Sequence, residues 1–195
     1  MTTKNPRGTS AADAAPRLTY IAFLRGVNLG PSRRLAMADL RTWLADLGYT
    51  NVRTHLQSGN VVLDSTDSAA EVARQLEKRI EARAGFQVNC VVRTPAQLRR
   101  VVEANPFDGV ATDDAKLVVA FLSGEPDPGR FADVDFTAFE PELFHAAKTE
   151  IYLWHPNGIH KSKLTALLTD RRLGVSATAR NWRTVTKMLE IAESG

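Results

Sequence analysis

The first half of the chain alternates between apolar runs and polar turns in an order that predicts six elements of secondary structure. A nearly continuous apolar run is typical of a strand in the middle of a sheet, and apolar positions three and four apart are typical of a helix. A capping box of Ser68 and Glu71 marks the start of the second helix. The order β-α-β-β-α-β predicts a ferredoxin-like α+β sandwich over residues 17–93. The expected strands are 18–24, 52–57, 60–64 and 87–93, and the expected helices are 37–47 and 69–80.

The second half opens with three agreeing signals for a helix start. Thr94 supplies an N-cap, Pro95 takes the first helical position and Gln97 stands three residues after the cap. No internal repeat is visible in the sequence, and we expect residues 94–195 to form a second, modified α+β half with carboxyl-terminal helices. A hairpin turn is expected at 148–150. The expected strands are 117–122, 136–139, 143–146 and 151–155, and the further helices are 162–173 and 179–192.

Two polar, glycine-containing turns follow neighbouring strands of the first half. In the ferredoxin-like topology, right-handed crossovers make the first and second strands parallel, so both turns lie at one edge of the sheet. The turns carry a guanidinium, amides, a hydroxyl and glycines that let backbone N–H groups approach a ligand. A nearby helix start adds free N–H groups, which favours an anion. We therefore predict one ligand-binding rim from Arg25, Gly26, Asn28, Gly30, Gln57, Ser58, Gly59 and Asn60.

A purely structural interpretation of these turns stays open. Ser58 and Gly59 are also what a hairpin turn requires, and the amides can bond to their own loop. Arg25 can equally act as a structural tether. The residues by themselves do not decide between a binding site and a self-satisfied turn network.

Composition narrows the class of protein. The chain has 195 residues, of which 44% are hydrophobic and 24% charged, as in an ordinary globular protein. Its single cysteine, Cys90, excludes an internal disulfide and sits in a strand pattern that suggests a small buried hydrophobe. No run of about 18 apolar residues occurs, so we expect no membrane partner and a cytoplasmic location. Residues 1–16 lack the apolar stretch of a signal peptide, and we expect a disordered arm there.

Familiar catalytic motifs are missing from the sequence. The loop after Gly26 lacks the Gly-Lys-Ser/Thr of a P-loop, and no Gly-x-Gly-x-x-Gly fingerprint occurs. Ser58 lacks the Gly-x-Ser-x-Gly elbow of a hydrolase nucleophile, and the four histidines show no metal-ligand spacing. No metal site is expected, the cofactor and any catalytic residue stay unknown, and an enzyme with its own chemistry at the same rim remains an alternative.

A basic segment near the carboxyl end raises a second alternative. Residues 161–187 carry seven basic residues against one acid, Asp170, which gives 7 − 1 = +6. Such charge suits a nucleic acid, although a solvated face is the simpler interpretation. Only Trp182 is interleaved with the charges, and its spacing is typical of a core residue. The basic residues are Lys161, Lys163, Arg171, Arg172, Arg180, Arg183 and Lys187.

Several motifs in order resemble the bacterial family of uncharacterised proteins known as domain of unknown function 1697. They lie at 20–30, 37–40, 47–54, 57–62, 105–107 and 178–184. The resemblance implies an α+β protein of ferredoxin-like halves and no established activity. It adds Arg180, Asn181 and Thr184 to the expected ligand-binding residues, with helix capping as their structural alternative. Where the family loop often carries Gly and Lys, this chain has Pro31-Ser32-Arg33-Arg34.

These observations together predict a cytoplasmic protein that binds a small anionic molecule at the rim formed by the 25–30 and 57–60 turns. A nucleotide is one candidate for that molecule. A nucleic-acid-binding module and an enzyme are the alternatives.

Overall fold

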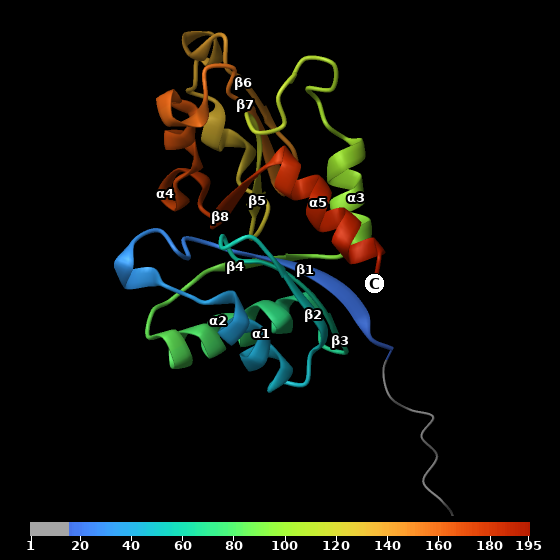
Figure 1. Cartoon of the computed structure of the whole chain (residues 1–195). Helices are drawn as coiled ribbons and strands as arrows, with labels where there is room; N and C mark the ends of the chain where they lie inside the picture. Colours follow the sequence, from blue (N-terminus) through green and yellow to red (C-terminus); the bar gives the residue numbers. More distant parts are fainter. Residues whose placement is uncertain (1–15) are drawn as a thin grey trace, which may run out of the picture.

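The computed structural model describes residues 16–195, so the expected arm at residues 1–16 lies outside the described residues except for its last position. The described chain is a mixed α+β fold with two four-stranded antiparallel sheets (Figure 1). The strands are β1 (Leu18–Leu24), β2 (Thr50–His55), β3 (Asn60–Ser65), β4 (Cys90–Arg93), β5 (Leu117–Leu122), β6 (Leu143–Ala146), β7 (Glu150–Trp154) and β8 (Ala177–Asn181). The helices are α1 (Met37–Ala45), α2 (Ala69–Ala84), α3 (Pro95–Glu103), α4 (Asp170–Leu173) and α5 (Trp182–Glu193).

The first sheet has the strand order β2-β3-β1-β4, with α1 and α2 on one face (Figure 1). This order places the third strand between the first and second, so it is compatible with the predicted ferredoxin-like sandwich. Alternate residues of β1 point to opposite faces. Leu24 packs with Leu40 of α1 and Leu76 of α2, whereas Phe23 packs toward the second half of the chain. Burial on both faces explains why this strand is apolar throughout.

The second sheet repeats the strand order of the first. Its order is β6-β7-β5-β8, so β5 to β8 correspond in turn to β1 to β4. The helical connections are reduced, because short 3-10 turns and α4 replace the two long helices of the first half. The predicted second, modified α+β half is therefore present, and it repeats a topology that no similarity of residues reveals.

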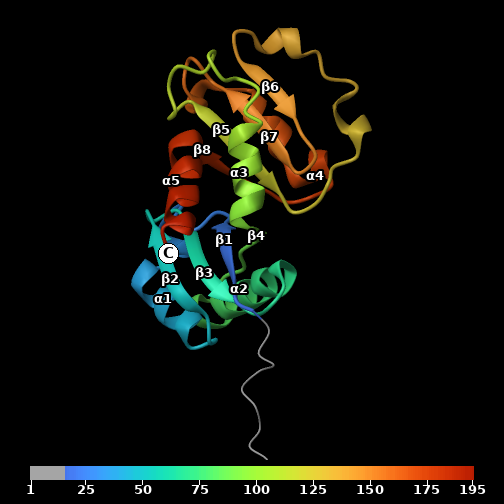
Figure 2. The same ribbon diagram turned by 90° about the vertical axis from the view of Figure 1, so that its right-hand side faces the viewer.

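A layer formed by α3 and α5 joins the two sheets. The two helices lie side by side between the sheets, as Figure 2 shows. Residues from both helices and from both sheets share one buried cluster. At its centre the rings of Phe23 and Phe121, at equivalent positions of β1 and β5, stack with centroids 4.4 Å apart. Aromatic pairs at this separation stabilise a core beyond their buried area.

Three elements differ from the sequence-based expectation. Residues 136–139 form a 3-10 turn, η3 (Phe136–Phe139), because Asp135 accepts a hydrogen bond from the Thr137 N–H and starts a turn. The helix expected at 162–173 is broken into η5 (Leu164–Leu168) and α4. The helix expected from 179 begins at Trp182, since β8 takes the preceding residues into the second sheet.

The start of α2 is capped more simply than the sequence suggests. Ser68 Oγ accepts from the Glu71 N–H at 3.3 Å, as expected of an N-cap. The Glu71 carboxylate does not return to Ser68 but pairs with Arg74, so the capping box is only half formed. Thr94 and Gln97 form the complete box at α3. In the part of the chain that the structure describes, no helix is both long and apolar enough to cross a membrane.

Tyr152 gives a pH-dependent test of the layer between the sheets. Its hydroxyl donates to Val101 O at 2.8 Å, and burial, assisted by the charge of Glu150, raises its pKa to about 12. The folded-state pKa exceeds the unfolded value, so this stabilisation is complete below pH 10 and is lost as the pH rises toward 12. We expect Tyr152→Phe to flatten the fall in unfolding free energy over this interval, measured by urea denaturation at stepped pH. An unchanged slope would contradict the assignment.

Candidate functional site

The two polar turns lie in contact at one edge of the first sheet. The Leu24 N–H donates to Gly59 O at 2.8 Å, and Asn28 Nδ2 donates to Gln57 O at 2.6 Å. The ends of β1 and β2 therefore share a rim, as the topology requires.

Asn28 organises the loop that follows β1. It has a left-handed φ of 57°, its Nδ2 also donates to Leu35 O at 3.0 Å, and its Oδ1 accepts from the Leu35 N–H at 2.8 Å. Both Nδ2 hydrogens are used, because the second bonds to Gln57 O. The Asn28 amide thus holds the loop and keeps no N–H for a ligand.

Arg33 holds the same loop from the other side. Its Nε donates to Gly26 O at 2.6 Å and its Nη2 donates to Gln87 O at 2.7 Å. Its guanidinium also lies over the Phe86 ring, 5.0 Å from the centroid. Gly26, with φ 67°, presents its carbonyl to this guanidinium. Arg33 is therefore a structural residue of the rim.

Arg180 joins the rim from β8 in the second sheet. The residue is only 9% exposed, and burial lowers the pKa of its guanidinium to about 10. Within residues 16–195 no carboxylate pairs with it, and its donors are occupied by neutral oxygens. These acceptors are the side-chain oxygens of Asn60 and Thr178 and the backbone oxygens of Leu24, Ser58 and Ala179.

Asn60 completes this arrangement. Its Oδ1 accepts from Arg180 Nε, and its Nδ2 donates to His55 O at 2.9 Å and to Ser58 Oγ at 3.0 Å. The side chain is fully buried. Arg180, Asn60 and Ser58 therefore converge, and they bond to one another rather than facing an open space.

Arg93 on β4 of the first sheet makes the equivalent contacts with residues of the second sheet. Its Nη2 donates to Leu122 O at 2.8 Å and Thr149 O at 3.2 Å, and its Nε pairs with Glu150 at 3.0 Å. Leu122, Thr149 and Glu150 occupy the positions of Leu24, Gly59 and Asn60 in the repeated topology. Each sheet thus sends one arginine to the rim of the other. Sequence reasoning missed Arg93, because its role is visible only once the two strand registers are compared.

The remaining predicted residues are divided between the surface and helix α5. Arg25, partly exposed, forms an ion pair of 2.5 Å with Asp170 of the second half. Asn181 caps α5, because its Oδ1 accepts from the Thr184 N–H at 3.0 Å. Thr184 is buried. The two residues thus form the cap of α5, and both also line a cavity of ≈ 610 Å³.

Gly59 has a steric role in the rim. Its φ is 75°, and a Cβ there would lie 2.7 Å from Leu24 Cβ and 2.7 Å from Val27 Cγ2. No side chain fits at this position without displacing β1 or the following loop.

An open cavity of ≈ 490 Å³ lies beside the two turns. Arg34 in its wall is exposed, and its guanidinium has no partner within residues 16–195. Ala36 provides no side-chain cap for α1, so the first N–H groups of that helix are not bonded to a side chain. The lining residues are Asn28, Gly30, Pro31, Arg34, Leu35, Ala36 and Gln57. The sequence indicated Asn28, Gly30, Gln57 and the nearby helix start, all of which the structure places at this cavity.

The basic segment 161–187 is spread over separate places in the described chain. Arg180 is buried, Arg172 pairs with Asp133 at 2.5 Å, and Lys187 pairs with Glu190 at 2.8 Å. Only part of the formal charge of this segment is therefore free on the surface.

The fold and the rim define an α+β protein in which two topologically equivalent sheets meet at a polar edge. The chain matches the family model described as "Protein of unknown function (DUF1697)" over residues 18–152, and it belongs to that family. In fold it is similar to a solved structure of the conserved bacterial protein SP0830 from Streptococcus pneumoniae, with a TM-score of 0.73 and 22% identity. That alignment covers 91% of this chain and 99% of the other. A search of curated proteins gave no match.

Replacing Gly59 by alanine tests the steric role of the turn. We expect Gly59→Ala to lower the free energy of unfolding by about 2–5 kcal/mol, from left-handed strain and overpacking together. Gly85→Ala is the matched control, because Gly85 has φ 77° and a Cβ at that position would meet no atom within 4 Å. Urea denaturation should give a loss of about 1–2 kcal/mol for the control. Equal losses would contradict a steric clash at Gly59.

Replacing Arg180 by lysine tests the arginine contact itself. A lysine has three donors and no planar fork, so it leaves carbonyls of the rim unpaired. We expect Arg180→Lys to lower the free energy of unfolding by about 2–4 kcal/mol, measured by urea denaturation. The surface variant Arg99→Lys, which keeps its exposed pairing with Glu193, should change it by less than about 0.5 kcal/mol. A loss at Arg180 as small as that of the control would show that the contact is dispensable.

Proposed function

We propose that the rim of this protein binds a small anionic molecule in the cavity beside the 25–30 and 57–60 turns. The observation that carries the proposal is the unpaired, exposed guanidinium of Arg34 in a ≈ 490 Å³ cavity at the uncapped start of α1. Helix starts and arginine forks are both complementary to phosphate and carboxylate groups.

The side chains that remain free to bind a ligand differ from the full set of binding residues that the sequence suggested. Arg34 and the Gln57 side chain have no hydrogen-bond partner within the described chain, whereas Asn60 and Arg180 are saturated. The buried charge of Arg180 adds positive potential behind the rim. The carboxylate of Asp39 in the first turn of α1 lowers this positive potential, but Asp39 is not among the cavity-lining residues.

The cavity wall favours the phosphate part of a nucleotide over its base. No aromatic side chain lines the cavity, so a base would have only Pro31, Leu35 and Ala36 as apolar contacts. A compact phosphorylated metabolite or a nucleotide held by its phosphates fits this wall best.

Arg34 supplies the test of this proposal. We expect Arg34→Ala to weaken binding of pyrophosphate and ATP by about tenfold, since a charged hydrogen bond of roughly 1.5 kcal/mol is lost. Isothermal titration calorimetry at low salt measures the effect. Arg83→Ala removes the same charge from an exposed residue of α2 outside the cavity wall and should leave the affinity unchanged.

Two results would overturn the proposal. One is equal affinity in the Arg34 and Arg83 variants, which would reduce binding to a general charge effect. The other is the absence of binding of either ligand to the unchanged protein at about 1 mM, a weak affinity limit for a metabolite site.

A further inference from the structure

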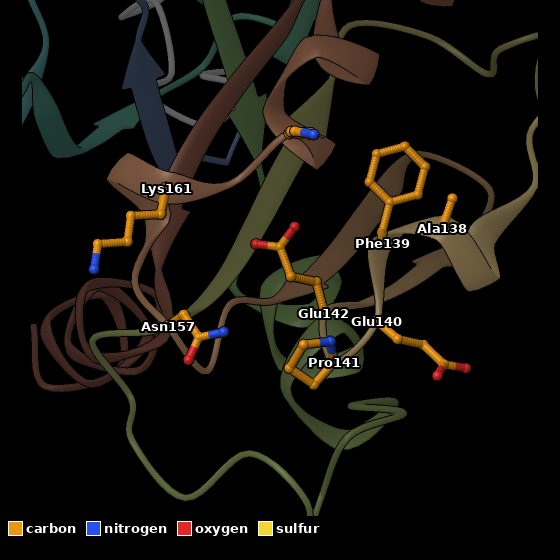
Figure 3. Close-up of a pocket in the computed structure, with 8 residues that line it drawn as sticks. Ala138, Phe139, Glu140, Pro141, Glu142, Asn157 and Lys161 are labelled. Atoms are coloured by element: carbon orange, nitrogen blue, oxygen red, sulfur yellow. The ribbon is translucent and has the colours of Figure 1, made fainter.

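A second cavity, of ≈ 460 Å³, opens in the second half of the chain, away from the rim residues (Figure 3). One wall is the segment that ends η3, with Phe139, Pro141 and Glu142. The opposite wall is the loop after β7, with Asn157, Lys161 and Lys163. Figure 3 shows the Glu142 carboxylate between Phe139 and the ribbon at Lys161, whose side chain extends away from Glu142.

Glu142 is held in a fixed position. Its Oε1 lies 3.0 Å from His155 Nδ1, and its Oε2 lies 3.1 Å from Ser162 Oγ. A carboxylate only accepts hydrogen bonds, so both neighbours donate to it. The Ser162 oxygen meanwhile accepts from the Leu164 N–H at 3.1 Å, which leaves its own proton free for Glu142.

His155 makes no other side-chain hydrogen bond within residues 16–195. The side chain is fully buried, and its Nε2 has no hydrogen-bond partner within residues 16–195. An unpartnered buried polar atom destabilises a fold. The ring therefore acts as a support for Glu142, and such local costs are typical of functional sites.

The two lysines give the other wall the opposite charge. Lys161 and Lys163 are exposed, and neither forms an ion pair or hydrogen bond with another described residue through its side chain. Two carboxylates, Glu142 and Glu140, and two lysines thus line one cavity, and of the four only Glu142 has a side-chain partner among the described residues.

We propose that this cavity binds a free amino acid with an apolar side chain. The ammonium group donates to Glu142, and the carboxylate meets Lys161, Lys163 and the Asn157 amide. The side chain lies against Phe139 and Pro141. A plain anion would be repelled by Glu142 and a plain amine by the lysines, so the ligand needs both charges. The cavity volume is within the range of small-molecule sites.

The ligand requirement can be tested on the full chain by two-dimensional ¹H–¹⁵N NMR titration. L-Leucine is the probe, with 4-methylpentanoate as the analogue without the amine and 3-methylbutylamine as the analogue without the carboxylate. We expect leucine to shift amide signals at 138–142 and 157–163, and each analogue to bind at least about tenfold more weakly. Analogues that bind as well as leucine, or no shift at about 10 mM leucine, would overturn the proposal.

Variants test the two charged walls separately. Glu142→Gln keeps the shape and removes the charge, and Lys161→Ala combined with Lys163→Ala removes the opposite wall. Each should weaken leucine binding at least about tenfold, whereas Glu103→Gln on the exposed face of α3 should not. Because both lysines are exposed, the lysine variant tests the site even where Glu142→Gln fails to fold. Unchanged leucine affinity in the folded variants would refute the site.

Discussion

The contact on which the rest of the structure depends is the buried guanidinium of Arg180 at the junction of the two sheets. Burying a charge without a carboxylate is unfavourable unless every donor finds an acceptor. Main-chain oxygens of Leu24 and Ser58 supply much of that compensation, and the Asn60 amide supplies more. These oxygens converge only while the turn at Gly59 keeps its left-handed conformation. The rim therefore has the shape that is needed to surround the buried Arg180 guanidinium with acceptors.

The contact of Arg93 repeats this arrangement in the reverse direction, because an arginine of the first sheet bonds to the rim of the second. Contacts in which each half reaches the equivalent position of the other are those of a twofold arrangement. One difference breaks the equivalence, because Arg93 meets the carboxylate of Glu150 whereas Arg180 meets the amide of Asn60. The second rim holds a neutral pair, and the first holds an uncompensated positive charge. The two otherwise equivalent edges of the molecule thus differ in electrostatic character.

The sequence predicted most of the first half, because its strands and helices have strong apolar periodicity and their cap and turn signals agree. It did less well after residue 135, where short segments with Phe and Leu fit a strand, a helix or a 3-10 turn equally. β8 was missed because Thr178 and Arg180 are polar residues that point into the junction, where only tertiary contacts make them acceptable. The repeat was invisible for a related reason: it keeps strand order and contact positions rather than residue types.

The candidate site shows a different limit of prediction. Polar residues on glycine-containing turns look alike in sequence whether they hold a ligand or hold the fold. In this chain Asn28, Asn60 and Arg180 hold the fold, and the groups left facing the cavity are Arg34 and Gln57. A rigid scaffold that presents a few free donors is what positions a binding site. The motif residues therefore describe the scaffold, and the exposed Arg34 belongs to the loop that this scaffold holds in place.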